Sequence, residues 1–265
     1  MNFDIITSRN NPLIKEIAKL SDKKHREESS LFAFEGRKLL SEALQSGVQI
    51  VNIFVTQKAL QVVQKMDIPC RLTVVSDEVY DKISFEKSPE GIFCVAKTLD
   101  KFHNLYIIDR REDFQQGSYF VLDGIRDPGN LGTILRTASA FGCDCLIMSE
   151  DCADIYNPKT VRASMGAIFR QKTLRASDLT AVIHNLRECD KTVYAATLDD
   201  NSISLFDTKV NSNVCFVVGN EGNGIRSEVI GACNGSVIIP MENGTESLNA
   251  AAASTILLYE AYRQR

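Results

Sequence analysis

The C-terminal stretch, residues 237–265, constrains the fold of this chain most strongly. A short apolar run at 237–240 is followed by a polar loop at 241–246 and then by a segment with four consecutive alanines at 250–253. Alanine is the strongest helix former, and its small side chain lets a helix approach a neighbouring backbone closely. The stretch therefore predicts a strand, a loop and a helix over 247–262, with Ser247 as the helix cap. By itself, this ending also fits the last packing unit of any α/β domain.

The second half of the chain repeats the same pattern. Apolar strands are predicted at 119–123, 145–148, 193–197, 215–218 and 237–239, and helices at 130–141 and 159–164. Short strands rich in Val and Ile that alternate with helices are typical of a parallel sheet covered on both faces. Ligands bind such sheets at the carboxyl ends of the strands. The polar, glycine-rich loops of this half all follow predicted strands, so we expect a binding site there.

The first half predicts a smaller α/β unit. Helices are expected at 12–20, 37–46, 57–65 and 77–83, and strands at 31–36, 50–55, 72–75 and 91–97. This alternation implies a small sheet with helices against it. The half contains no carboxylate pair and no His or Cys constellation that would suggest catalysis.

The polar stretch 98–118 separates the two halves. We interpret it as a linker or a short interdomain helix, because it carries a run of charged residues at 109–113 and no apolar periodicity. The predicted division is an N-terminal domain at 1–100, a linker at 101–117 and a C-terminal domain at 118–265.

Composition narrows the class of protein. With 265 residues, 44% hydrophobic and 24% charged, the chain can form one large or two ordinary soluble domains. Neither a membrane-length apolar run nor a signal peptide is evident, so we expect a cytoplasmic protein. Its eight cysteines include no CxxC pair, which argues against disulfides and a structural zinc site and fits a reducing compartment. We therefore expect no metal.

Charge is distributed unevenly. The net charge of −4 argues against an obligate polyanion binder, but residues 8–38 hold eight Lys or Arg against five Asp or Glu, a local excess of +3. A mixed-charge helix surface explains this excess as well as a nucleic-acid contact does.

Two upstream loops of the second half add to the C-terminal one. In the loop and helix at 123–138, Asn130 can cap the helix, and Arg136 lies nearly two turns further on, so both can face one crevice. A capping Asn and a solvent-facing Arg are the alternative. The loop at 219–224 has three glycines, which permit positive φ and a close approach of a ligand to backbone N–H groups. It matches neither the phosphate loop nor the dinucleotide fingerprint, because the spacing is reversed and no Lys follows.

Together and in this order, the three loops closely resemble the signature motifs of the SpoU (TrmH-like) branch of the SPOUT RNA methyltransferases. The matching segments are residues 127–136, 219–224 and 239–260. The first half is similar to the substrate-binding module often fused to these enzymes, through residues 8–15 and 34–36. The resemblance thus covers nearly the whole chain.

The resemblance implies a C-terminal α/β domain with a parallel sheet and a deep trefoil knot, preceded by a small, ribosomal-protein-like α/β substrate-binding domain. It implies that S-adenosylmethionine binds in a bent form at the knot, largely through backbone groups. The positions that match the family's cofactor contacts are Gly219, Ile239 and Leu248, with Thr197 and Leu198 as weaker candidates. The family acts as a homodimer whose interface lies beside the knot, so that two chains complete each site.

The implied reaction transfers the methyl group of S-adenosylmethionine to a ribose 2'-hydroxyl of RNA. Ribosomal RNA is the expected substrate because of the fused N-terminal module, and transfer RNA is the alternative. By motif matching, the catalytic residues are Arg136, Asn130, Glu221, Ser247 and Asn249.

The resemblance leaves open which group accepts the proton of the ribose 2'-hydroxyl. A family proposal makes the Arg a general base, but an arginine with a pKa above about 12 is effectively always protonated. A charged Arg136 that holds a phosphate and stabilises alkoxide charge would serve equally well. Glu221 as a base would need a large upward shift from a pKa of about 4.3, and it can instead accept N–H bonds from its own loop.

One position departs from the family pattern. Ala251 replaces a Ser that many relatives carry, so we expect activity to survive with a slightly different cofactor geometry. RNA contacts are expected from the basic N-terminal segment and from Arg126, Arg162 and Arg170, with affinity that falls only moderately with salt.

Two other functions are alternatives to a ribose methyltransferase, namely an RNA-binding protein without catalysis and a base methyltransferase on the same scaffold. The sequence does not identify the RNA or the nucleotide.

Overall fold

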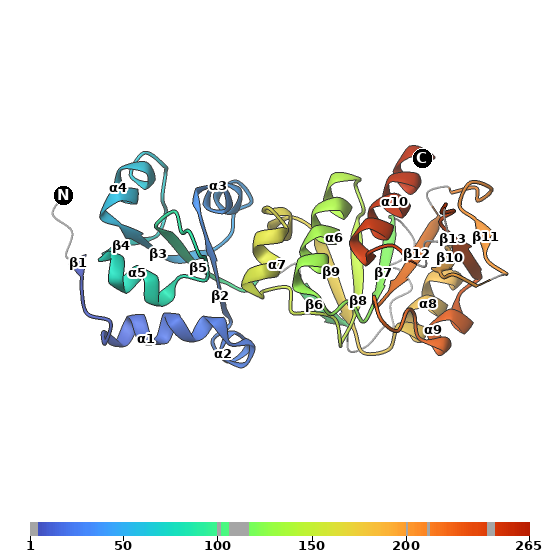
Figure 1. The fold of residues 1–265 in the computed structure, drawn as a ribbon, viewed down its shortest axis with the longest axis horizontal. Coiled ribbons are helices and arrows are strands. Elements are labelled where there is room, and N and C mark those ends of the chain that lie inside the picture. The colour runs from blue at the N-terminus through green and yellow to red at the C-terminus, as the bar shows by residue number, and fades with distance from the viewer. Residues whose placement is uncertain (1–4, 100–101, 106–116, 200, 211–212, 243–246) are drawn as a thin grey trace. The chain divides into compact units, whose positions relative to one another are not determined.

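The computed structural model describes residues 5–99, 102–105, 117–199, 201–210, 213–242 and 247–265 (Figure 1). The chain forms two compact units. One consists of Met1–Leu99 and Asp154–Phe169, and the other of Asp100–Ala153 and Arg170–Arg265. The short segment Asp154–Phe169, which the sequence analysis assigned to the C-terminal domain, thus groups with the N-terminal residues.

The N-terminal unit is built on a mixed sheet. Among the described residues, its strands have the order β1-β4-β3-β5-β2, in which β1, β4 and β3 are parallel and β5 is antiparallel to β3 and β2. The strand bounds are Ile5–Ile6 (β1), Leu31–Glu35 (β2), Ile50–Thr56 (β3), Arg71–Val75 (β4) and Ile92–Lys97 (β5). The helix bounds are Pro12–Ala18 (α1), Lys23–Ser29 (α2), Arg37–Gln45 (α3), Gln57–Val63 (α4), Asp77–Ile83 (α5) and Pro158–Ala163 (α7). The predicted helices and strands of this half are confirmed, whereas β1 and α2 were not foreseen.

Long-range contacts explain why residues 154–169 belong to this unit. The Tyr156 ring lies 4.7 Å from the Phe32 ring, and the Phe169 ring lies 5.1 Å from that of Phe34, centroid to centroid. Asp154 pairs with the buried Arg26, with 2.5 Å between Asp154 Oδ2 and Arg26 Nη2. These partners are far apart in sequence, so no local pattern could have assigned the segment.

The C-terminal unit contains the predicted parallel sheet. Among the described residues the strand order is β11-β13-β10-β12-β7-β8-β9-β6, and every pairing is parallel. The bounds are Phe102–Leu105 (β6), Tyr119–Asp123 (β7), Cys145–Ser149 (β8), Lys172–Ala176 (β9), Thr192–Ala196 (β10), Ile203–Ser204 (β11), Val214–Gly219 (β12) and Gly235–Ile238 (β13). The α/β fold with a parallel sheet is confirmed. The trefoil knot stays an implication of the family resemblance.

The interpretation of 98–118 as a linker or helix is wrong at Phe102–Leu105. These residues form β6, which pairs with β9 in parallel at the edge of the sheet. An edge strand needs only a backbone partner on one side, so it can form without the apolar pattern that marks central strands. Residues 106–116, which include the charged run at 109–113, lie outside the described residues.

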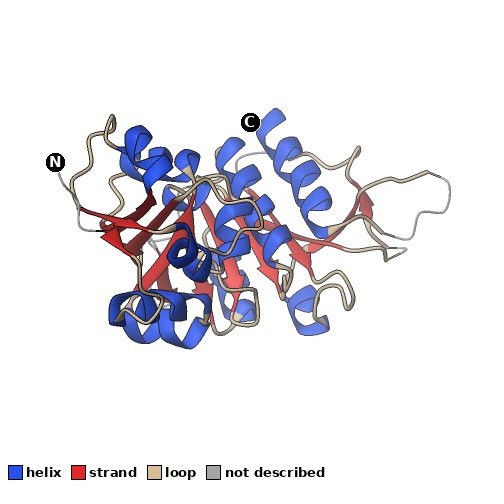
Figure 2. Ribbon diagram, turned by 60° about the vertical axis from the view of Figure 1, so that its left-hand side comes forward, coloured by secondary structure: helices blue, strands red, loops and turns tan. Residues whose placement is uncertain are grey.

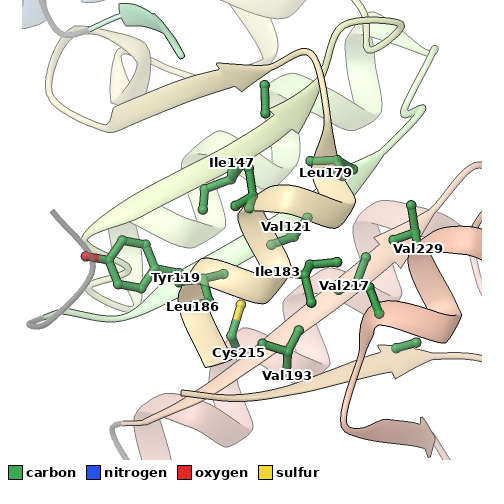
Figure 3. Close-up of a cluster of buried hydrophobic side chains, with 14 of the residues drawn as sticks. Tyr119, Val121, Ile147, Leu179, Ile183, Leu186, Val193, Cys215, Val217 and Val229 are labelled. Atoms are coloured by element: carbon green, nitrogen blue, oxygen red, sulfur yellow. The ribbon is translucent and has the colours of Figure 1, made fainter. Parts of the chain in front are cut away.

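Helices lie on both faces of the C-terminal sheet (Figure 2). Their bounds are Pro128–Ala140 (α6), Leu179–Glu188 (α8), Ser227–Ala232 (α9) and Ala250–Arg263 (α10). Figure 3 shows Leu179, Ile183 and Leu186 of α8 over strand residues that include Val121 and Val217. Neighbouring strand residues point to the opposite face, where α6 and α10 pack together and α10 contacts β12.

Candidate active site

A pocket with a volume of about 580 Å³ opens where β10, β12 and β13 end. Its wall is formed by the ends of these strands, the loop at 220–224 and the first turn of α10. The lining includes all five positions expected to contact a cofactor and two of the expected catalytic residues, namely Thr197, Leu198, Gly219, Ile239 and Leu248, with Glu221 and Ser247. The structure thus gathers residues that are scattered over the second half of the sequence. Met241, Asn223 and Ile230 also line the pocket and were not foreseen.

The loop at 220–224 is closed by its own backbone. Asn220 and Gly224 exchange two backbone hydrogen bonds of 3.0 and 2.9 Å, and Asn220 Oδ1 accepts the N–H groups of Gly222 and Asn223 at 2.8 and 3.2 Å. A Cβ atom at Gly219 would lie 2.3 Å from the Gly224 carbonyl carbon. Gly219 is therefore required for space. Gly224 has a φ of +69°, which favours glycine.

A chain of hydrogen bonds connects one residue from each of the three loops. Asn249 Oδ1 accepts the N–H groups of Ala251 and Ala252 at 2.9 and 3.2 Å, which leaves its Nδ2 to donate to Asn130 Oδ1 at 3.1 Å. Asn130 Nδ2 then donates to Glu221 Oε1. Each amide can take only one orientation in this chain, because an Oδ1 accepts and an Nδ2 donates. The arrangement therefore fixes the Glu221 carboxylate from one side.

Both predicted helix caps are wrong by a few residues. The N-cap of α6 is Asp127, whose side chain accepts the Asn130 N–H at 2.8 Å, and the N-cap of α10 is Asn249. Pro128 fixes φ at the first position of α6, so the helix begins two residues, and its cap lies three residues, ahead of Asn130. The shift leaves the Asn130 side chain available to Glu221. Ser247 is exposed and lies in the pocket wall, ahead of the helix.

Arg136 is not joined to this group of side chains. It lies on α6, is exposed, and makes no hydrogen bond or ion pair with any residue that the structure describes. Its guanidinium is thus available to a bound molecule. Whether it faces the same crevice as Asn130 stays a prediction.

The other arginines expected to contact RNA differ in their surroundings. Arg126 is largely exposed and lies 3.6 Å from the Asp151 carboxylate. A hydrogen bond from Ser149 lowers the pKa of Asp151, and the nearby arginines lower it further. Arg162 pairs with Glu86 inside the N-terminal unit. Arg170 is exposed.

Asp123 and Arg226 form an ion pair that the sequence analysis did not anticipate. Asp123 is 2% exposed at the end of β7, and the guanidinium Nη2 of Arg226 lies 2.6 Å from Asp123 Oδ1. The hydrogen bond to Asp123 raises the pKa of Arg226. The available signal was an acidic residue at the end of an otherwise apolar strand.

Comparison with known proteins identifies the family. Residues 117–259, more than half of the chain, match the family model described as "SpoU rRNA Methylase family". The chain belongs to the SpoU rRNA methylase family. Residues 11–94 match a second model, described as an MRM3-like substrate binding domain. The resemblance inferred from the three loops and the first half is thereby confirmed.

Two relatives and one crystal structure illustrate how similar known proteins are to this chain. The chain is 27% identical over 254 residues to the 23S rRNA (guanosine(2553)-2'-O)-methyltransferase RlmP of Bacillus subtilis, covering 96% of this chain and 97% of that protein. It is 35% identical over 184 residues to the 23S rRNA (uridine(2479)-2'-O)-methyltransferase of Streptomyces viridochromogenes, covering 68% and 62%. The crystal structure of an AdoMet-bound rRNA methyltransferase from Sinorhizobium meliloti matches with a TM-score of 0.85 and 31% identity over 98% of both chains.

The described residues contain neither a candidate membrane span nor a candidate metal site. Every helix among them is too short or too polar to span a bilayer. No group of His, Cys, Asp and Glu side chains in the described part of the chain is arranged to hold a metal ion.

Proposed function

We propose that this protein is an S-adenosylmethionine-dependent methyltransferase that modifies a ribose 2'-hydroxyl of RNA, with ribosomal RNA as the expected substrate and transfer RNA as the alternative. The observation that carries the proposal is the meeting of the three motif loops. The cofactor positions Gly219, Ile239 and Leu248 line one pocket, and its wall residue Glu221 is bonded to Asn130.

The pocket suits S-adenosylmethionine in size and character. About 580 Å³ lies within the usual range of small-ligand sites. Leu198, Ile239 and Leu248 offer apolar surface to an adenine ring, and the strand ends around Gly219 present backbone groups. When bound, the cofactor supplies a methyl group that is already activated, so the protein's task is to orient the acceptor and favour its deprotonation.

We assign a catalytic role to each expected site residue from its surroundings. Arg136, which has no acidic partner among the described residues, is free to hold a phosphate and to stabilise charge on the ribose oxygen. Asn249 orients Asn130, and Asn130 orients Glu221 at the pocket wall. Ser247 contributes a hydroxyl to the same wall.

The transfer of labelled methyl from S-adenosylmethionine to unmodified ribosomal and transfer RNA pools tests the function. Alkaline digestion should leave the label in a resistant dinucleotide, because a methylated 2'-oxygen cannot attack the adjacent phosphodiester. Arg136→Ala should abolish the label while cofactor binding persists. Label in mononucleotides would instead indicate a base methyltransferase, and cofactor binding without any transfer would favour an RNA-binding protein. Absence of cofactor binding contradicts the proposal.

The domain division and the location are part of the same proposal. We assign RNA binding to residues 1–100 and catalysis to residues 118–265, to which β6 adds an edge strand from the intervening stretch, and we place the protein in the cytoplasm. The local charge excess within residues 8–38 supports the first assignment.

We also propose a homodimer formed through α6 and α10. Ile256, Tyr259 and Tyr262 of α10 are 37%, 49% and 54% exposed, which gives this helix an apolar outer surface. Phe141, which follows α6, places its ring 5.5 Å from that of Tyr259, so the end of α6 borders this surface. A self-complementary surface of this kind suits a twofold interface.

Sedimentation of Tyr259→Arg tests the dimer. We expect this variant to be monomeric, whereas Phe206→Arg, which changes an 83% exposed aromatic residue outside α10, should remain dimeric. A wild-type monomer at micromolar concentration would refute the interface.

A further inference from the structure

Both ends of the pocket loop, residues 219–226, are attached to Asp123. At the start of the loop, Gly219 of β12 is the register partner of Asp123 in β7. At its end, the Asp123 carboxylate accepts the Arg226 backbone N–H at 2.8 Å and the Arg226 Nε–H at 2.8 Å. Because Asp123 is almost completely buried, it serves as an inner anchor for the loop.

Gly124, the residue after Asp123, holds the loop at a second point. Asn220 Nδ2 donates to the Gly124 carbonyl at 2.8 Å, and the Gly124 N–H donates to Ser149 Oγ at 2.8 Å. Ser149 Oγ donates in turn to Asp151 Oδ1 at 2.6 Å. Gly124, which holds Asn220, is thus itself fixed to the end of β8.

The segment held by Arg226 is also the one that closes the pocket loop. A Cβ atom at Gly219 would lie 2.4 Å from the Ile225 nitrogen as well as 2.3 Å from the Gly224 carbonyl carbon, so this segment passes directly over Gly219. All residues from Gly219 to Ile225 line the pocket. Release of Arg226 would allow the segment to lift from Gly219 and would separate Glu221 from Asn130.

We propose that Asp123 and Arg226 are positioning residues for the methyl transfer. Their ion pair holds the loop at 219–226 in the closed form that binds the cofactor and keeps Glu221 against Asn130. This inference rests on the proposed function. Asp123 does not act as a base, because the donors of Arg226 occupy both of its oxygens and it is not among the residues that line the pocket.

Cofactor affinity and turnover of Arg226→Met, measured in the full chain, test the inference. Met keeps an apolar stem but removes every guanidinium donor. We expect S-adenosylmethionine to bind at least tenfold more weakly in calorimetry, and methyl transfer at saturating cofactor to slow at least tenfold. A loss of stability alone would leave both quantities unchanged at temperatures where the variant is folded.

Arg187→Met is the matched control. Arg187 donates from Nη1 to the Ala232 carbonyl at 2.7 Å, on the side of α8 and α9, so its loss removes a similar hydrogen bond without contact to the loop. Its cofactor affinity should equal that of the wild type.

A double variant covers the case in which Arg226→Met does not fold, since removal of Arg226 leaves the buried Asp123 without its counter-ion. Asp123→Asn combined with Arg226→Met removes both charges. If the pair acts as a unit, this variant folds and shows the same tenfold or greater loss of affinity. Wild-type affinity in either folded variant overturns the inference. A wild-type protein that binds no S-adenosylmethionine contradicts the proposed function instead, so the two failures can be told apart.

Discussion

Two arginines, one in each unit of the molecule, have opposite surroundings. In the N-terminal unit, Arg26 is 3% exposed, and its guanidinium is bound by Asp154 and by the carbonyls of Leu20 and Ser21 at 2.8 and 2.9 Å. In the C-terminal unit, the guanidinium of Arg136 is exposed and has no partner among the described residues. The same residue type is thus fully paired at Arg26 and has no partner among the described residues at Arg136.

The difference separates groups that hold the fold from groups that serve the site. Removal of one partner of a buried ion pair is strongly destabilising, because the remaining charge is left without a partner and without solvent. An exposed charge contributes almost nothing to stability, but it retains its donors for substrate. Loss of Arg26 should therefore act on stability, and loss of Arg136 on the proposed activity.

Arg26→Met should give the largest effect on stability. It leaves the Asp154 carboxylate and two backbone carbonyls without their donor, so we expect a loss of about 3–5 kcal/mol in the free energy of unfolding. Urea unfolding followed by circular dichroism measures this. Lys24→Met on the same helix, where the ammonium is 84% exposed, should change it by less than about 0.5 kcal/mol. Equal losses in the two variants would break the comparison.

Gly219→Ala should have an intermediate effect and should act on the site. The new methyl group must displace the backbone at Gly224, which costs about 1–3 kcal/mol. Because this backbone is a pocket wall, we expect cofactor affinity to fall by about tenfold or more in calorimetry. Gly231→Ala, where a Cβ meets nothing within 4 Å, should bind the cofactor normally. A less stable Gly219→Ala with wild-type affinity would show that the loop serves the fold alone.

The sequence was sufficient for most of the regular structure, and its failures have physical causes. Central strands such as β7 and β12 are buried on both faces, so their apolar runs are unmistakable. The helix α2 has the sequence KKHREES and lacks apolar periodicity, because it is held chiefly by Arg26. By contrast, α8 carries apolar residues at the spacing of a buried helix face, so the signal existed and was overlooked.

The site was predictable in its parts but not in its connections. Motif matching named Asn130, Glu221 and Asn249, which one hydrogen-bond chain joins. It could not decide which of several neighbouring polar residues caps each helix, because the cap is set by where the backbone enters the helix. Nor could it find the pair of Asp123 and Arg226, whose contact crosses two loops and has no local signature.

Glu35→Gln should give the smallest effect and sharpens the comparison within the N-terminal unit. Glu35 accepts hydrogen bonds from the Tyr80 and Ser84 hydroxyls at 2.9 and 2.7 Å and from the Phe85 N–H at 2.5 Å. Burial nevertheless raises the pKa of Glu35 above its usual 4.5. Gln keeps the shape and can satisfy the same partners, so at pH 7 we expect stability to change by only about 1 kcal/mol.

The pH dependence gives this prediction its sign. A raised pKa in the folded state means that Glu35 favours folding most below pH 4.5, and that this contribution is lost as the pH rises through the raised value. The unfolding free energy of the wild type minus that of Glu35→Gln should therefore fall as the pH rises from 4.5. Tyr80→Phe removes a hydrogen bond that lowers the pKa of Glu35, so the fall should extend to higher pH. If the difference is flat across this range, the hydrogen bonds to Glu35 fully compensate its burial.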